Sequence, residues 1–296
     1  MTASRKLRPR VDPGGAGDPD PLSDFISMRL LFVLALGTLV TGCRERSANL
    51  DEILAASEFV DLTHAFDSST VYWPTEEGFV LEEGYAGYTE RGYYYAANSF
   101  RAAEHGGTHL DAPVHFAEGK WTTDMIPVAS LIGPAVVVDV SAGAREDRDY
   151  QVSVDDFTAW EEQHGRLQEG VIILLNTGFS TFWPDRTSYM GTDKRGAEAV
   201  ARLRFPGLGP AAAEWLVRNR RVRAIGIDTP SIDYGQSTHF ESHRILFDAN
   251  IPALENVAAP SSLPATGAWV FALPMKIAGG SGGPLRLVGV IPSTSS

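Results

Sequence analysis

The stretch HGGTHLDAPVHF, residues 105–116, holds three of the seven histidines of this chain together with one aspartate. The four side chains are His105, His109, Asp111 and His115. Imidazole nitrogens and carboxylate oxygens are ordinary ligands of Zn²⁺ and Mn²⁺. Their density here predicts a shared metal site. The alternative is a polar loop whose histidines are hydrogen-bonded separately.

The two glycines and the proline of this stretch restrict how its backbone can run, because they make a helix improbable. In an extended strand, His109, Asp111 and His115 would point to one side, since side chains alternate with a period of two. The glycines would let His105 fold back toward the same point. This geometry suits a metal ion held by two imidazoles and a carboxylate.

A second group of ligand-type side chains lies in STHFESHRILFDANIPALENV, residues 237–257. It contains His239, Glu241, His243 and Glu255. The apolar run IPALENV places Glu255 in a poorly solvated setting, where an unpaired charge is costly. The carboxylate therefore needs a partner, and a cation is a suitable one.

HGGTHLDAPVHF resembles the signature of the metal-dependent cyclase family, which includes bacterial kynurenine formamidases and isatin hydrolases. The remaining segments that match the family are DLTH at 61–64, Trp73-Pro74, GIDTPSID at 226–233, the His-then-Glu segment 243–255 and LPMKI at 273–277. The resemblance implies a single compact α/β domain of the swivelling β/β/α type, usually in a homodimer or a higher homo-oligomer.

The resemblance also implies a role for each candidate ligand. His105 and His109 would bind a first metal ion, and Asp111 would bridge it to a second one. His243 would bind the second ion, and Glu255 would bridge the two ions from the opposite side.

Two further roles follow from the same resemblance. His115 would be the catalytic acid/base and not a ligand, and Trp73 would line the substrate pocket. The neighbours of Trp73, in VYWPTEEG, depart from the family's usual Trp-Pro-Gly-Asp, which leaves the substrate open. His239 remains an alternative to His243 as a ligand on spacing grounds.

The reaction that the resemblance implies is hydrolysis of the C–N bond of a formamide or a cyclic amide, as in arylformamidases and isatin hydrolases. The nucleophile would be a hydroxide activated by two divalent metal ions. The ligand set mixes imidazole and carboxylate without thiolate, which suits Zn²⁺ or Mn²⁺ and argues against Cu(I) or an iron–sulfur cluster. Zinc is the favoured ion and manganese the second. The alternative is a non-catalytic lipoprotein that binds a metal or a small ligand, although such a protein has no need of His115.

The first 43 residues differ from the rest of the chain. Arg29 precedes an apolar run from Leu30 to Val40, which is too short to span a bilayer but fits the core of a signal peptide. The run leads to Cys43, the only cysteine, in a pattern that resembles a bacterial lipoprotein signal. It predicts an exported protein anchored in a membrane by a lipid on Cys43. The alternative is a buried N-terminal helix.

The rest of the chain divides simply, with residues 44–57 as a polar tether and 58–296 as one catalytic domain. Of the 296 residues, 44% are hydrophobic and 21% charged, which is typical of a globular protein. The formal net charge of −12 argues against nucleic-acid binding.

Elements that could position the candidate site alternate along the domain. Strand-like segments are expected at 59–66, 93–100, 135–141, 171–176, 222–228, 269–277 and 285–291. Helices are expected after Ser153 and from Gly209-Pro210 onward. This alternation predicts α/β layers around a central sheet, in which the apolar runs 135–140 and 171–175 are central strands. The aromatic residues 93–95 are expected in a strand that packs in the core, and the alternative is that one of their rings faces an aromatic substrate. AGGSGG, residues 278–283, is expected to join two strands of a hairpin.

Overall fold

A computed structural model describes residues 49–293 of the chain. The predicted lipidation residue Cys43 lies outside these residues, and so does the predicted end of the signal peptide at residue 43. Within residues 49–293, no helix is both long enough and apolar enough to cross a membrane.

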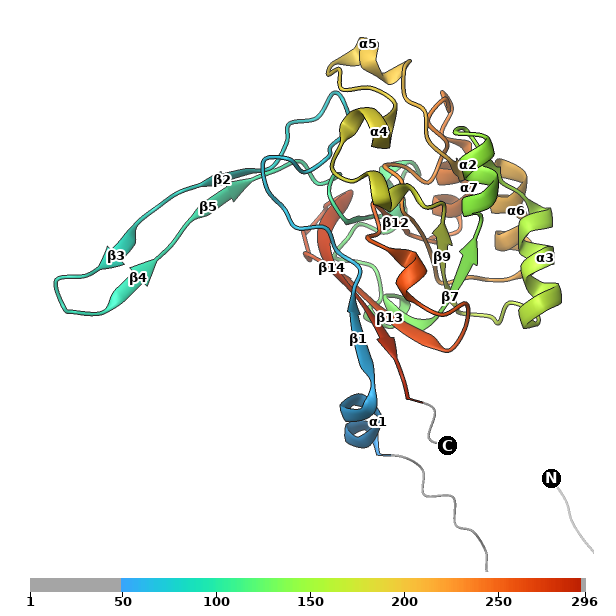
Figure 1. Cartoon of the computed structure of the whole chain (residues 1–296), viewed down its shortest axis with the longest axis horizontal. Coiled ribbons are helices and arrows are strands. Elements are labelled where there is room, and N and C mark those ends of the chain that lie inside the picture. The colour runs from blue at the N-terminus through green and yellow to red at the C-terminus, as the bar shows by residue number, and fades with distance from the viewer. Residues whose placement is uncertain (1–48, 294–296) are drawn as a thin grey trace, which may run out of the picture. The chain divides into compact units, whose positions relative to one another are not determined.

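The domain is built on an eight-stranded mixed sheet in the order β1-β14-β13-β7-β9-β11-β12-β6 (Figure 1). Its strands are β1 (Glu58–Asp61), β6 (His109–Asp111), β7 (Ile132–Asp139), β9 (Ile172–Asn176), β11 (Ala224–Ile227), β12 (Ala253–Glu255), β13 (Ala268–Pro274) and β14 (Gly282–Ile291). β7, β9, β11 and β12 run parallel to one another. The beginning of β14 also pairs with β6, so the strands from β14 round to β6 form a closed, barrel-like sheet.

The central strands bury side chains on both faces, which explains their nearly continuous apolar sequence. In β9, Ile172 and Leu174 point to the inside of the closed sheet, and Ile173 and Leu175 point outward. The outward side chains pack under α3 (Val154–His164), α6 (Pro210–Asn219) and α7 (Glu241–Asp248). These observations confirm the predicted α/β domain with a central mixed sheet.

Smaller elements complete the domain. The short helices are α1 (Leu50–Ala56), α2 (Ser141–Glu146), α4 (Arg186–Met190) and α5 (Ala197–Val200). The 3-10 turns are η1 (Pro113–His115), η2 (Val128–Ser130), η3 (Phe179–Phe182) and η4 (Pro260–Ser262), and β8 (Gln151–Val152) pairs with β10 (Gly207–Leu208).

The two predicted helices begin where the sequence indicates. Ser153 precedes α3 and accepts a hydrogen bond from the backbone N–H of Asp156, whose carboxylate accepts one from the backbone N–H of Ser153 at 2.7 Å. This capping box satisfies two helix-terminal donors. α6 begins with Pro210, which has no N–H to leave unpaired at that position.

The aromatic residues 93–95 do not pack in the core, contrary to the prediction. They lie in a hairpin formed by β2 (Val80–Glu82), β3 (Ala86–Tyr88), β4 (Tyr94–Ala96) and β5 (Ser99–Arg101), in which β2 pairs with β5 and β3 with β4. Figure 1 shows this hairpin running away from the central sheet. Every residue of its four strands is exposed except Gly87, which is partly buried.

Replacing Leu174 should destabilise the domain strongly, because this side chain is fully buried inside the closed sheet. Leu174→Ala is expected to lower the free energy of unfolding by about 2–5 kcal/mol through lost burial and the cavity left behind. Chemical denaturation of the chelator-treated proteins measures the difference without a contribution from metal loss. The exposed Met125→Ala should change the free energy by less than about 0.5 kcal/mol. Equal effects of the two substitutions would contradict the assignment of the core.

Candidate metal centre

Two neighbouring strands and one helix bring the candidate ligands together. His109 and Asp111 are two residues apart in β6 and point to the same side. In the adjacent β12, Glu255 lies directly opposite His109. His243 comes from the first turn of α7. All four side chains are buried, and the half-buried His105 folds back onto them from the loop before β6.

The loop before β6 requires its two glycines. A Cβ on Gly106 would lie 2.1 Å from a ring carbon of Tyr72, and Gly107 has a φ of +58° in the left-handed region. The carbonyl of Gly107 accepts hydrogen bonds from Nδ1 of His109 and from Nδ2 of Asn256, at 2.9 and 2.8 Å. The glycines therefore let His105 reach the site, as the sequence predicts.

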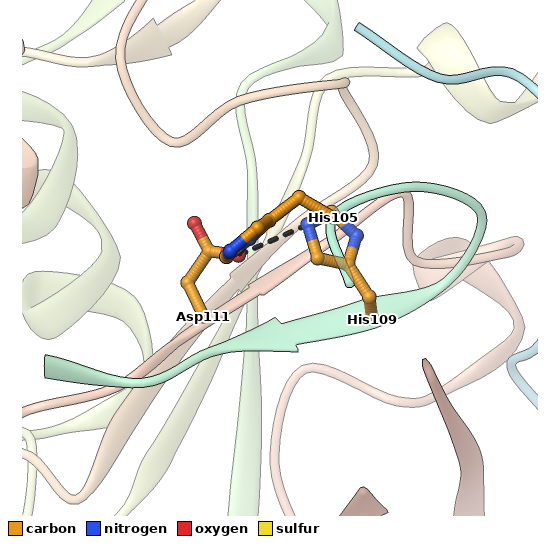
Figure 2. Close-up of side chains that lie close together, drawn as sticks. All are labelled: His105, His109 and Asp111. Atoms are coloured by element: carbon orange, nitrogen blue, oxygen red, sulfur yellow. Dashed lines mark hydrogen bonds and ion pairs between the residues drawn. The ribbon is translucent and has the colours of Figure 1, made fainter. Parts of the chain in front are cut away.

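The five predicted ligands form two groups that share Asp111. One group is His105, His109 and Asp111, drawn in Figure 2, and the other is Asp111, His243 and Glu255. Within each group, the possible ligand atoms lie within 4.8 Å of one another. The structure thus brings all five side chains together, although the sequence separates Asp111 from His243 by 131 intervening positions.

Both carboxylates turn one oxygen toward each group. Asp111 Oδ1 lies 2.7 Å from His105 Nδ1 and 3.0 Å from His109 Nε2. Its other oxygen lies 3.3 Å from His243 Nε2. Glu255 directs Oε2 toward His109 Nε2 at 3.6 Å and Oε1 toward His243 Nε2 at 3.1 Å. Each carboxylate therefore spans the space between the two groups of histidines.

The outer nitrogen of each ligand histidine has a partner that fixes which nitrogen faces inward. His109 Nδ1 can only donate to the Gly107 carbonyl. His243 Nδ1 donates to Asp233 at 2.5 Å, and this carboxylate also accepts from two backbone N–H groups. The inward Nε2 atoms of His109 and His243 therefore present lone pairs to the site.

His105 is held the other way round, with Nδ1 inward. Its Nε2 lies 2.9 Å from the hydroxyl of Ser281, and that hydroxyl donates its hydrogen to Glu104 at 2.6 Å. The hydroxyl has no second hydrogen, so the imidazole must donate to it. Ser281 belongs to AGGSGG, which joins β13 to β14 as predicted and also orients a ligand.

The side chains present fit a bound cation. Three imidazole lone pairs face carboxylate oxygens at 2.7–3.3 Å, and acceptors facing acceptors repel unless a positive charge lies between them. His109 Nε2 is buried without a hydrogen-bond partner among the described residues. A divalent ion would satisfy these atoms, and the nitrogen and oxygen donor set suits Zn²⁺ or Mn²⁺.

The charges within the site also indicate that it binds a cation. Burial and the neighbouring Asp111 raise the pKa of Glu255. Burial lowers the pKa of His243, but hydrogen bonds to the surrounding carboxylates outweigh it and raise this pKa well above its ordinary value. The inward nitrogen of His243 therefore attracts a positive charge strongly, whether a proton or a metal ion.

His115 lies beside both groups and belongs to neither of them. It ends the turn η1 instead of continuing the strand, because Pro113 begins that turn. The expected extended path through residue 115 is therefore wrong, but the ring still reaches the site and stacks on His105 with centroids 3.8 Å apart. Burial lowers the pKa of His115 to about 4, so its imidazole is neutral.

A cavity of about 290 Å³ opens onto these groups. Its lining includes His115, the ligand side chains and the aromatic residues Trp73, Phe116 and Phe240. The predicted position of Trp73 in the pocket wall agrees with this lining, and its ring lies 6.3 Å from that of Phe240.

Some functional residues were not predicted, and one alternative loses its support. Phe240 lines the cavity, but no local feature of the sequence indicates this.

Its neighbour His239, the alternative ligand, is exposed and belongs to neither ligand group. Asp233 occurs in the family segment GIDTPSID, which was its only signal, and nothing in the local sequence indicates the role of Glu104.

Comparison with known proteins gives consistent matches. Residues 60–234 match the family described as Putative cyclase. The chain is 32% identical to the isatin hydrolase of Roseibium aggregatum over 213 residues, which are 69% of this chain and 78% of that protein. It is 30% identical to the kynurenine formamidase of Salinibacter ruber over 231 residues, which are 77% of this chain and 95% of that protein.

A solved structure agrees with these matches. Isatin hydrolase A from Labrenzia aggregata, bound to benzyl benzoate, superimposes with a TM-score of 0.73 at 32% identity. The superposition covers 81% of this chain and 95% of that one.

Asp233→Asn should weaken metal binding without unfolding the domain, because an amide holds the ring of His243 less firmly than a carboxylate. Loss of such an orienting partner typically costs 10–100-fold in metal affinity. Competition between the protein and a chelating dye for Zn²⁺ measures the change. Asp155→Asn, an exposed carboxamide substitution on α3, is the matched control and should bind as the unmodified chain does. Equal affinities of the two variants would show that Asp233 does not orient the ligand.

Proposed function

Because the chain belongs to the cyclase family, we propose that it hydrolyses a C–N bond in a formamide or a cyclic amide. It is a metal-dependent amidohydrolase, as its relatives named isatin hydrolase and kynurenine formamidase are. The observation that carries the proposal is the position of His115, a neutral imidazole that lines the cavity beside two ligand groups without belonging to either. A site that only stores metal has no need of such a residue.

The two groups would hold two divalent ions, Zn²⁺ or Mn²⁺, with His105 and His109 at one and His243 at the other. Asp111 and Glu255 each offer an oxygen to both. When bound, such ions lower the pKa of water and polarise a carbonyl group.

His115 would move the proton of the reaction. A neutral imidazole first accepts the proton of the attacking water at its free nitrogen. It then gives this proton to the amide nitrogen, which leaves poorly as an unprotonated group. Burial keeps the ring unprotonated at the start, because it lowers the pKa to about 4.

The aromatic wall indicates the kind of substrate. Trp73, Phe116 and Phe240 offer flat apolar surfaces on which an aromatic ring can stack. They also keep water away from the reacting group. An aryl formamide, such as N-formylkynurenine, and a lactam fused to an aromatic ring, such as isatin, both fit this description. The sequence after Trp73-Pro74 differs from the family pattern, and Thr75 and Glu76 line the cavity there.

We also propose that the chain is exported and anchored to a membrane through a lipid on Cys43. The apolar run 30–40 after Arg29, and the single cysteine that follows it, support this location. An exported enzyme of this class would act on amides or lactams that reach it from outside the cytoplasm.

The proposal predicts that the chain, when supplied with Zn²⁺ or Mn²⁺, opens isatin or releases formate from formylated anilines. A chelator should abolish this turnover.

The His115→Ala variant should retain its metal, and its kcat should fall by about 10²–10⁴-fold, the usual contribution of a general acid/base. Asp111→Ala should lose both metal and turnover. Elemental analysis and steady-state kinetics on the same samples separate these outcomes.

His239→Ala is the matched control, since this histidine is exposed and outside both groups, and its kcat should be unchanged. Failure of the metal-loaded chain to turn over any compound of the panel would favour the binding protein instead. A His115→Ala variant with normal kcat would refute the role given to His115.

A further inference from the structure

The charged side chains that line the cavity are acidic, apart from its histidines. Asp111 and Glu255 are buried among the candidate ligands, whereas Glu76 is exposed. No lysine or arginine occurs among the described residues that line the cavity. Thr75 and Glu76 are the exposed members of this lining, so they mark the end of the cavity that opens to solvent. A negative charge therefore stands at the entrance.

The backbone around Glu76 is anchored, which fixes the position from which its side chain extends. The N–H of Glu76 donates to the carbonyl of Trp73 at 3.0 Å and closes a turn. The carbonyl of Glu76 accepts a hydrogen bond from the guanidinium of Arg195. The N–H of Gly196 donates to the carbonyl of Pro74 at 2.8 Å. Glu76 is thus held in the same turn as Trp73, whose ring belongs to the pocket wall.

The carboxylate of Glu76 is available to a ligand. Its neighbour Glu77 forms an ion pair with Arg101. Arg195 binds the backbone carbonyl of Glu76, and the Glu76 carboxylate has no ion pair within residues 49–293. Glu76 also belongs to neither ligand group. A cation that enters the cavity would therefore be its first direct partner.

The aromatic rings of the cavity favour a ligand of the same charge. The ring of Phe240 lies 6.3 Å from that of Trp73 and 5.0 Å from that of Phe116, so the three rings form one cluster. The faces of aromatic rings attract cations as well as other rings. Aromatic faces beside a carboxylate are the combination that binds an ammonium group.

We propose that the substrate carries a cationic nitrogen, such as an ammonium group, at the end remote from its amide bond, and that Glu76 binds this group and so determines specificity. The proposal rests on the proposed hydrolysis, which places the amide at the buried ligands and the rest of the substrate toward the entrance. The substrate class is then an aromatic amide or lactam with a cationic substituent. N-formylkynurenine carries an ammonium and a carboxylate on one carbon, so Glu76 would attract one group and repel the other.

The size of the effect follows from the exposure of Glu76. An exposed ion pair changes an equilibrium constant by about 1.5–5-fold, and contact of the cation with aromatic faces adds a factor of about 2–5. Together they give a preference of about 3–25-fold for a cationic over a neutral substrate. Salt should reduce the part that Glu76 contributes, because ions screen exposed charges.

Steady-state kinetics of the metal-loaded full chain on substituted formanilides tests the proposal. The ring carries an aminomethyl, a hydroxymethyl or a carboxyl group, each in the meta and the para position. The aminomethyl compounds should have the highest kcat/KM and the carboxyl compounds the lowest. Glu76→Gln should lower the preference for aminomethyl over hydroxymethyl by about 1.5–5-fold, mainly through KM, because the contact is remote from the reacting bond.

Two further variants sharpen this test. Glu76→Lys should lower the ratio of kcat/KM for aminomethyl to that for carboxyl compounds by about tenfold, since it attracts the anion and repels the cation. Glu77→Gln is the matched control, because Glu77 is exposed and outside the cavity lining, and it should keep the original ranking. Thermal unfolding checks that each variant is folded. Rankings that are the same in the unmodified chain and in both Glu76 variants would overturn the proposal.

A binding measurement separates this proposal from the proposed hydrolysis. Benzyltrimethylammonium has no lone pair with which to bind a metal ion, and calorimetric titration measures its Kd. Glu76→Gln should raise this Kd by about 1.5–5-fold and Glu76→Lys should raise it further, whereas Glu77→Gln should leave it unchanged. Equal Kd values in all four proteins would refute the cation site. Formanilides that are not hydrolysed, together with binding of this cation that depends on Glu76, would refute the hydrolysis and retain the cation site.

Discussion

The carboxylate of Asp111 is buried among three imidazoles, and most of the surrounding structure serves to make that burial tolerable. Its oxygens face the inward lone pairs of His105, His109 and His243 at 2.7–3.3 Å. Without a cation these groups would repel one another or bind protons, and isolated buried charges are costly. The pair of divalent ions that we propose would offset the burial of both carboxylates.

The closed sheet brings the ligand side chains of β6 and β12 together. β6 and β12 are neighbours, so Glu255 lies directly across from His109, although the two are far apart in the chain. Asn256, which follows Glu255, connects the end of β12 to the loop before β6. Its side chain donates to the Gly107 carbonyl, and its own carbonyl accepts from the hydroxyl of Thr108 at 2.8 Å. These two bonds hold the loop before β6 against the end of β12, beside the ligands His109 and Glu255.

The site could be located from sequence because four candidate side chains lie within eleven residues and Glu255 lies in an apolar run, whereas the choice of His243 over His239 depended on the family resemblance. The orienting partners of the ligands could not be located in this way. Asp233 and Ser281 act only through contacts that exist after folding, and neither residue type has a distinctive local pattern. The closure of the sheet was also beyond prediction, because it depends on pairing between β14 and β6. The tyrosines 93–95 were expected in the core, because their apolar sequence alone does not distinguish a buried strand from the exposed hairpin in which they lie.

Anomalous X-ray diffraction from crystals grown with Zn²⁺ or Mn²⁺, collected at the absorption edge of the metal, tests the central claim most directly. The proposed function predicts two anomalous peaks on either side of Asp111, one contacted by His105 and His109 and the other by His243, with Glu255 contacting both. A single peak, or peaks that do not contact Asp111, would contradict the two-ion centre on which the proposed hydrolysis depends.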